Sequence, residues 1–263
     1  MRSSLSVTLI CKDEEQNIVD CLGSVSWADE IIVVDSGSTD KTVELAKQFT
    51  PKVIYRPWEG FAAQKQFALE QATCDYILSI DADERVTPGL KDEILTLLEE
   101  PQQAAGWYVP RRTEFFGKWI TSCGWYPGYQ LRLFKRGRVT VTQRKVHEGF
   151  VVEGNTVKLK HDLLHYTHES FEKTIAKINH YSSLSAEEKS SRKKVTALNL
   201  FLNPVAAFFT HYFIKRGFTD GVQGFMVSVM HSMTNMMTYL KIYEIQKREL
   251  REQLHKKGME DRS

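Results

Sequence analysis

Apolar runs and amphipathic segments alternate along the first hundred residues of the chain. Each apolar run has the length of one buried strand, and each amphipathic segment has the length of a short helix. The predicted strands cover residues 5–10, 30–34, 52–55 and 74–80. Four helices are predicted: one that ends near Ser24, one over residues 41–48, one over residues 60–72, and one that begins after an N-cap at Thr87, with Pro88 at its first position, and ends at Glu100. The alternation predicts an α/β fold with a Rossmann-like, doubly wound, mainly parallel sheet and helices on both faces.

Residues 106–170 differ in character, because aromatic residues and glycines are dense between Gly106 and Tyr129. Strands are predicted at 131–134 and 149–152, as a mixed extension of the sheet. The aromatic side chains could form core and turns. They could equally form a surface for a carbohydrate, whose CH-rich face is apolar while its rim is polar.

The chain is predicted to be helical and basic from Ser170 onward. Residues 185–195 are polar and are predicted to be a hinge, and two apolar segments follow at 198–213 and 218–243. The tail from Lys247 is expected to be solvated and frayed.

The first apolar segment contains Pro204 and is short for a helix that spans a bilayer. Basic clusters border it, Arg192–Lys194 on one side and Lys215–Arg216 on the other. Such clusters favour a helix that lies in the interface of an anionic membrane. The alternative is a helical hairpin that packs on the domain or on a second copy, so a homo-oligomer is possible.

Charge is unevenly distributed, although the formal net charge is only +2. Residues 1–100 carry 9 Lys/Arg and 19 Asp/Glu, whereas residues 101–263 carry 26 and 14. An acidic first part suits a metal site, and a basic second part suits anionic partners. No nucleic-acid-binding motif accompanies the basic part, so a nucleic acid partner is not expected.

The four cysteines form no C-x-x-C pair, which predicts neither a zinc site nor a disulfide framework. Reduced thiols are typical of a cytosolic setting. The first apolar run is too short for the core of a signal peptide, and it leads directly into the charged residues Lys12–Glu15. We therefore expect a cytoplasmic protein.

Three carboxylates lie within four residues, Asp81, Asp83 and Glu84, at the end of the fourth predicted strand. Their mutual repulsion would be relieved by a divalent cation. Magnesium or manganese, held by one or two carboxylates and the oxygens of a diphosphate, is the usual partner of such oxygen ligands. The alternative is a solvated acidic turn.

Acidic residues also follow the first two predicted strands, in the stretches Lys12–Glu15 and Asp35–Asp40. The carboxyl ends of parallel strands meet at one edge of a sheet, where ligands bind. These turns and the Asp81–Glu84 turn are therefore predicted to lie at the same edge.

With these stretches the sequence resembles the family 2 glycosyltransferases of the GT-A fold. The matching stretches are LSVTLICKDEEQNI, EIIVVDSGSTDKT, AQKQFALEQA, YILSIDADE, QLRLFK and VHEG, with NPVAAFF and KRGFTDGVQGF nearer the C-terminus. Within the family the chain is similar to lipopolysaccharide inner-core β-1,4-glucosyltransferases. The resemblance implies a GT-A catalytic domain at 1–170, with a nucleotide-sugar half at 1–100 and an acceptor half at 101–170. A helical, membrane-associating region would occupy 171–263.

The resemblance also implies roles for single residues. Those expected to bind the nucleotide sugar are Asp13, Glu14, Asp35, Lys65, Asp81 and Arg132, and Asp83 would ligate the metal. The general base would lie in the Val146–Gly149 turn, as Glu148 or alternatively His147, and would take a proton from the acceptor hydroxyl.

These implications predict an inverting, metal-dependent enzyme that moves one hexose, glucose from UDP-glucose, to a heptose of the lipopolysaccharide core. It would work on the cytoplasmic face of the bacterial inner membrane. The QxxRW motif of processive members is missing, which indicates transfer of a single sugar. Alternative acceptors are a polyprenyl phosphate or another glycan. A non-catalytic nucleotide-sugar-binding scaffold is the alternative from another class; a nucleotidyltransferase is disfavoured, because no Gly-rich phosphate loop lies near the N-terminus.

Overall fold

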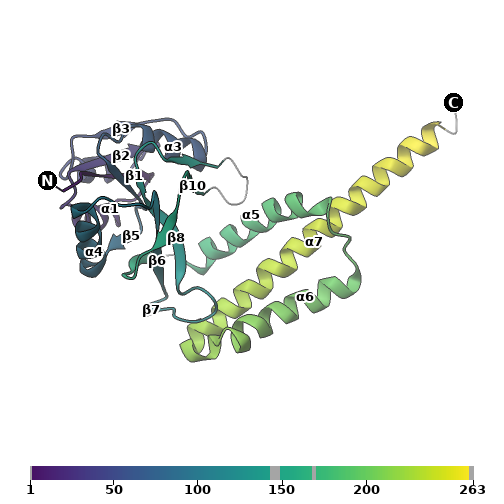
Figure 1. Cartoon of the computed structure of the whole chain (residues 1–263). Coiled ribbons are helices and arrows are strands. Elements are labelled where there is room, and N and C mark those ends of the chain that lie inside the picture. The colour runs from purple at the N-terminus through teal and green to yellow at the C-terminus, as the bar shows by residue number, and fades with distance from the viewer. Residues whose placement is uncertain (1, 143–148, 168–169, 261–263) are drawn as a thin grey trace. The chain divides into compact units, whose positions relative to one another are not determined.

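The structure, a computed structural model, describes residues 2–142, 149–167 and 170–260 (Figure 1). The chain divides into two compact units. The sheet unit comprises residues 1–119 and 125–167, and the helical unit comprises residues 120–124 and 168–263. Segment 120–124 thus belongs to the helical unit, although residues of the sheet unit precede and follow it in the chain.

The first part of the sheet unit has strands and helices in the predicted order. The elements are β1 (Leu5–Cys11), α1 (Ile18–Ser24), β2 (Glu30–Asp35), α2 (Thr42–Ala46), β3 (Val53–Tyr55), α3 (Phe61–Glu70), β4 (Tyr76–Asp81), β5 (Glu84–Val86) and α4 (Pro88–Glu99). The N-cap predicted at Thr87 is confirmed, because its side chain accepts a hydrogen bond from the backbone N–H of Leu90.

The second part of the sheet unit consists of strands. They are β6 (Gly106–Phe115), β7 (Lys118–Trp119), β8 (Gly128–Lys135), β9 (Val139–Val141), β10 (Phe150–Val152), β11 (Thr156–Lys158) and β12 (Leu163–Thr167). The two strands predicted here are confirmed as β8 and β10, with slightly different bounds.

One large sheet has the strand order β3–β2–β1–β4–β8–β6–β12–β5. The first four strands of the chain are parallel to one another, whereas β8 is antiparallel to both β4 and β6. β12 is parallel to β6 and antiparallel to the edge strand β5. The predicted fold class and the predicted mixed extension are both confirmed.

Helices cover both faces of this sheet. Successive side chains of a strand point to opposite faces, so the strands contribute apolar side chains to two separate cores. Leu5, Val7 and Leu9 of β1 pack in one core with the buried faces of α1 and α4. Ile32 and Val34 of β2 pack in a second core with α3 and with the small β9–β10 sheet.

The helical unit contains three long helices. They are α5 (Phe171–Ser190), α6 (Ala197–Phe209) and α7 (Gly221–Glu260); a π-helical turn (Thr210–Ile214) and a 3₁₀ turn (Gly217–Asp220) connect the last two. α7 packs against both α5 and α6.

Two predictions for this region are wrong. The predicted hinge at 185–195 is partly helical, because α5 continues to Ser190. Its buried residues Thr174, Ile178, Ser182 and Ala186 recur every four positions, so the polar residues between them lie on its outer side. The predicted frayed tail is also helical as far as Glu260, since residues 247–254 are mostly strong helix formers.

The segment 120–124 is held in the helical unit by Asp220, which is only 4% exposed. The Asp220 carboxylate accepts hydrogen bonds from the backbone N–H of Thr121 and of Ser122, each at 2.9 Å, and from Ser122 Oγ at 2.6 Å. The Cys123 N–H donates to the Lys215 carbonyl at 2.9 Å. These bonds fasten the segment to the turn between α6 and α7.

Candidate active site

The acidic turn Asp81–Glu84 connects β4, in the middle of the sheet, to β5, its outermost strand. Asp81 ends β4, beside Ile10 of β1, and Glu84 begins β5, beside His165 of β12. Cys11 of β1 pairs with Asp35 of β2, so the ends of β1, β2 and β4 meet at one edge, as predicted. The strand register therefore brings residues from distant parts of the sequence to this turn.

Arg132 of β8 lies between two carboxylates of the turn. Its Nη2 is 2.5 Å from Asp81 Oδ2 and 2.6 Å from Glu84 Oε1. Arg132 is 4% exposed and Glu84 is fully buried, so Glu84 does not face a ligand. The Glu84 carboxylate also accepts from the backbone N–H of Asp81 at 3.0 Å, whereas the buried Nε of Arg132 has no hydrogen-bond partner among the described residues.

Asp81 remains accessible, with its side chain 32% exposed, and it has a second cationic partner. Lys65 Nζ of α3 is 3.0 Å from Asp81 Oδ1. Burial raises the pKa of Asp81, but the positive charges of Arg132 and Lys65 outweigh this effect and hold its pKa well below the usual range. Asp81 is therefore ionised at neutral pH.

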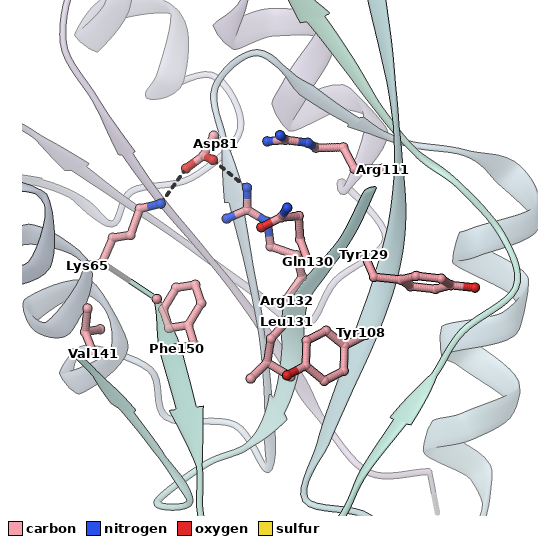
Figure 2. A pocket seen from close by; sticks show the side chains of 11 residues that line it. Lys65, Asp81, Tyr108, Arg111, Tyr129, Gln130, Leu131, Arg132, Val141 and Phe150 are labelled. Atoms are coloured by element: carbon pink, nitrogen blue, oxygen red, sulfur yellow. Dashed lines mark hydrogen bonds and ion pairs between the residues drawn. The ribbon is translucent and has the colours of Figure 1, made fainter. Parts of the chain in front are cut away.

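A cavity of about 300 Å³ opens beside this cluster (Figure 2). Three cationic side chains, Lys65, Arg111 and Arg132, and one carboxylate, Asp81, line one part of it. Figure 2 shows the rings of Tyr108, Tyr129 and Phe150 around the same cavity, with Phe150 beside Lys65. A lining of cations and aromatic rings suits a ligand that carries both an anionic group and a flat or CH-rich face.

Asp83 points to a different neighbour. Its Oδ2 lies 3.2 Å from Nε2 of His165, and the other ring nitrogen of His165 lies 3.2 Å from Thr113 Oγ1. The backbone N–H of Tyr166 donates to the Asp83 carbonyl at 2.9 Å, which fixes β12 against the turn. His165 was not among the site residues predicted from the sequence, because only the pairing of β12 with β5 and β6 brings it to Asp83.

Asp83 and His165 have the donor atoms and the spacing for one divalent cation. Neighbouring ligands of an octahedral ion with bonds of about 2.1 Å are about 3 Å apart, close to the observed separation. Manganese and magnesium accept carboxylate oxygens, manganese also binds imidazole, and a diphosphate can complete the shell. Among the described residues, no cluster of three or more His, Cys, Asp or Glu side chains could hold a metal.

The remaining predicted nucleotide-binding residues lie in the turn after β1 and at the last position of β2. Asp13 Oδ1 accepts from the Thr39 N–H at 2.7 Å, and buried Asp35 accepts from the Gly37 N–H at 2.9 Å. Glu14 accepts from Asn17 Nδ2 at 2.8 Å. None of these three carboxylates lines the cavity described above, so the structure places them at the same sheet edge but outside the cavity.

The predicted bases Glu148 and His147 lie outside the described residues. The residue that follows them, Gly149, lines the cavity together with Phe150.

Comparison with known proteins agrees with this architecture. Among solved structures, the mannosyltransferase PcManGT from Pyrobaculum calidifontis, in complex with GDP-Man and Mn²⁺, shares a TM-score of 0.52 at 15% identity, over 94% of this chain and 87% of that one. S. aureus TarS 1–349, in complex with UDP-GlcNAc, shares a TM-score of 0.51 at 13% identity, over 92% of each chain. At such identities the likeness shows the fold, which is that of GT-A glycosyltransferases.

The sequence comparisons define the family. The family model for glycosyl transferase family 2 matches residues 6–150. The lipopolysaccharide core biosynthesis glycosyltransferase LpsC of Rhizobium meliloti is 35% identical over 249 residues, which cover 91% of this chain and 92% of that protein. The chain thus belongs to glycosyl transferase family 2, and its activity is that of a glycosyltransferase.

Proposed function

We propose that this enzyme is an inverting, divalent-metal-dependent hexosyltransferase that moves glucose from UDP-glucose to a heptose of the lipopolysaccharide inner core. The observation that carries the proposal is the acidic turn, in which Asp83 pairs with His165 while Asp81, two residues earlier, lines a cavity of cations and aromatic rings. The similarity to LpsC supports a lipopolysaccharide core acceptor. The solved structures that hold GDP-Man with Mn²⁺, or UDP-GlcNAc, support a nucleotide-sugar donor.

In this proposal Asp83 and His165 hold Mg²⁺ or Mn²⁺. The ion supplies charge neutralisation for the departing diphosphate. Thr113 contacts the other ring nitrogen, Nδ1, and so orients the imidazole with Nε2 towards Asp83, where the ion would bind.

Polar side chains of the cavity and of the turns at the ends of β1 and β2 bind the donor. Lys65 is a flexible point charge that contacts the diphosphate. Arg132 is held by Asp81 and Glu84, so it keeps Asp81 in place and adds positive potential. Asp13, Glu14 and Asp35 accept from the uracil N–H and the ribose hydroxyls at the ends of β1 and β2.

Glu148, or alternatively His147, acts as the general base. It takes the proton from the acceptor hydroxyl as that oxygen bonds to the anomeric carbon, while the bond from this carbon to the diphosphate oxygen breaks and UDP leaves with the electron pair. Attack opposite to the leaving group inverts the anomeric configuration. The position of Gly149 on the cavity supports this assignment, because Glu148 directly precedes it.

The acceptor is proposed to be anchored in the inner membrane, and the enzyme is proposed to work at the cytoplasmic face of that membrane. The basic second part of the chain suits a phosphorylated lipid-linked glycan.

A transfer assay tests the proposal. Purified enzyme with Mn²⁺ receives radiolabelled UDP-glucose, UDP-GlcNAc or GDP-mannose, and heptose-terminated lipopolysaccharide core or polyprenyl phosphate as acceptor. The expected result is label from UDP-glucose on the core alone, with a β-linkage in the product. Labelling of polyprenyl phosphate instead would contradict the acceptor assignment. Donor binding without any transfer would indicate a scaffold.

A further inference from the structure

The outer face of α6 exposes a row of large apolar side chains. Leu198 is 65% exposed, Phe201 69% and Phe209 53%, with Leu202 and Val205 between them. These five residues occupy positions i, i+3, i+4, i+7 and i+11, and so they share one side of the helix. We call them the α6 face.

The opposite side of α6 is covered by α7. Pro204 is buried, its carbonyl accepts from Ser232 Oγ at 2.8 Å, and the rings of Phe208 and Phe225 lie 5.7 Å apart. α5 packs on α7 as well, and Figure 1 shows α7 running between α5 and α6. The α6 face is therefore left uncovered by the helices of its own unit.

The charges around the α6 face have one sign. Residues 189–219 contain six Lys/Arg and no Asp or Glu. The basic residues lie at the two ends of the helix, in Arg192–Lys194 and Lys215–Arg216, and all five of these side chains are exposed. Apolar side chains bordered by cations match the interface of an anionic bilayer, where acyl chains lie under negative headgroups.

By length alone, α6 could also cross a bilayer. Among the described residues, Ala197–Ile214 is the one helical stretch that is long and apolar enough. Its 18 residues would span about 27 Å, against a hydrocarbon core of about 30 Å.

The connections of the helical unit exclude this orientation. The turn after α6 holds segment 120–124, which is joined directly to Trp119 and Trp125 of the sheet unit, so the turn stays on the same side of a membrane as the sheet unit. The start of α6 follows α5, which carries six charged residues and cannot cross a bilayer. Both ends of α6 therefore stay on one side.

We propose that α6 is an in-plane membrane anchor, whose α6 face enters the headgroup boundary of an anionic bilayer while the basic residues at both ends contact the headgroups. The inference rests on the proposed function in one respect, since it identifies the surface by which the enzyme reaches a lipid-anchored acceptor.

Vesicle co-sedimentation of the full chain tests the anchor. The expected result is binding to vesicles of phosphatidylcholine with phosphatidylglycerol, much weaker binding to pure phosphatidylcholine, and release by added salt or alkaline carbonate. The variant Phe201→Ser/Phe209→Ser should bind the anionic vesicles at least tenfold more weakly. Phe171→Ser on α5, which removes a Phe that is 47% exposed, is the matched control and should bind as wild type does.

Three results would overturn the proposal. The folded wild type could fail to bind anionic vesicles, or it could resist carbonate extraction as a spanning helix does. Light scattering could also show a dimer that Phe201→Ser/Phe209→Ser converts to a monomer, which would mean that a second copy covers the α6 face. Transfer to a delipidated, soluble core acceptor separates this inference from the proposed function, because neither serine variant should change that activity.

Discussion

Nε2 of His165 lies 3.2 Å from Oδ2 of Asp83, although the two residues are far apart in the sequence. The contact exists because β12 pairs with β5 directly after the acidic turn. It gives the turn a nitrogen donor in addition to its carboxylates. It is also the part of the site that converts an acidic motif into a specific metal-binding proposal.

His165→Ala should raise the Mn²⁺ concentration needed for half-maximal transfer by about tenfold or more, because a ligand of the ion is lost. The measurement is a manganese titration of the transfer rate. His161→Ala is the matched control, since His161 also pairs with a carboxylate at 2.9 Å, but that carboxylate is Glu93 of α4 and not a residue of the acidic turn. An unchanged manganese requirement in His165→Ala would remove His165 from the site.

Glu148→Gln should keep UDP binding but slow transfer by a factor of about 10² to 10⁴, as expected for the loss of a general base. Single-turnover rates and UDP affinity are measured side by side. Glu153→Gln, which changes an exposed glutamate a few residues further on, should behave as wild type. If Glu148→Gln turns over at a near-normal rate, His147 becomes the candidate base.

Arg132→Leu should destabilise the protein by about 3–5 kcal/mol, because it leaves the fully buried Glu84 carboxylate without its closest cation. Urea unfolding measures the change. Combining Arg132→Leu with Glu84→Gln should recover part of the loss, since no uncompensated charge then remains at that position. Arg138→Leu, at an exposed position, should change stability by less than about 0.5 kcal/mol. Equal effects of both arginine variants would contradict the account.

Glu30 should make stability depend on pH in the acid range. Burial raises its pKa, but Lys52, Ser6 and Thr73 outweigh this effect and lower the pKa from 4.5 to about 2. A lowered folded-state pKa stabilises the protein above the unfolded value, and this stabilisation is lost as the pH falls from about 4.5 towards 2. The carboxylate is 8% exposed, and the shift corresponds to about 3 kcal/mol.

Glu30→Gln should therefore reduce the free energy of unfolding by up to that amount at pH 7, and by progressively less below pH 4.5. Urea unfolding of wild type and variant between pH 7 and pH 3.5 measures this difference. A difference that stays constant across the range would show that the ionised carboxylate is not the cause.

Gly224→Ala should destabilise the helical unit, because a Cβ at this position of α7 would lie 1.8 Å from the backbone oxygen of Gly217. The backbone must shift to relieve such a contact, at a cost of about 1–3 kcal/mol or more. Gly23→Ala in α1 is the control, since its Cβ would meet nothing nearer than 4.0 Å. Thermal unfolding should show a lower midpoint for the first variant alone; equal midpoints would contradict the close approach.

The sequence predicts the first part of the sheet unit well, because β1 to β4 are short, continuous apolar runs separated by turn and helix signals. The turn with Asp81 and Asp83 is visible for the same reason. His165 and Arg111 could not be found in this way. Their positions depend on the long-range register of β12 and β6, and neither residue belongs to a local motif.

The end of α5 was missed for a different reason. Residues 185–190 look like a polar linker, yet Ala186 continues a row of buried residues that faces α7. Tertiary packing thus decides the extent of this helix, and local composition does not.

Calorimetric titration of UDP-glucose tests the central claim most directly. Wild type, Asp83→Ala and, as a control at an exposed position of α4, Asp92→Ala are titrated with Mn²⁺ and then with EDTA. The account predicts binding by wild type and Asp92→Ala that requires Mn²⁺, and loss of this binding in Asp83→Ala. Equal affinity in EDTA, or undiminished binding by Asp83→Ala, would contradict a metal-dependent donor site at the Asp81–Glu84 turn.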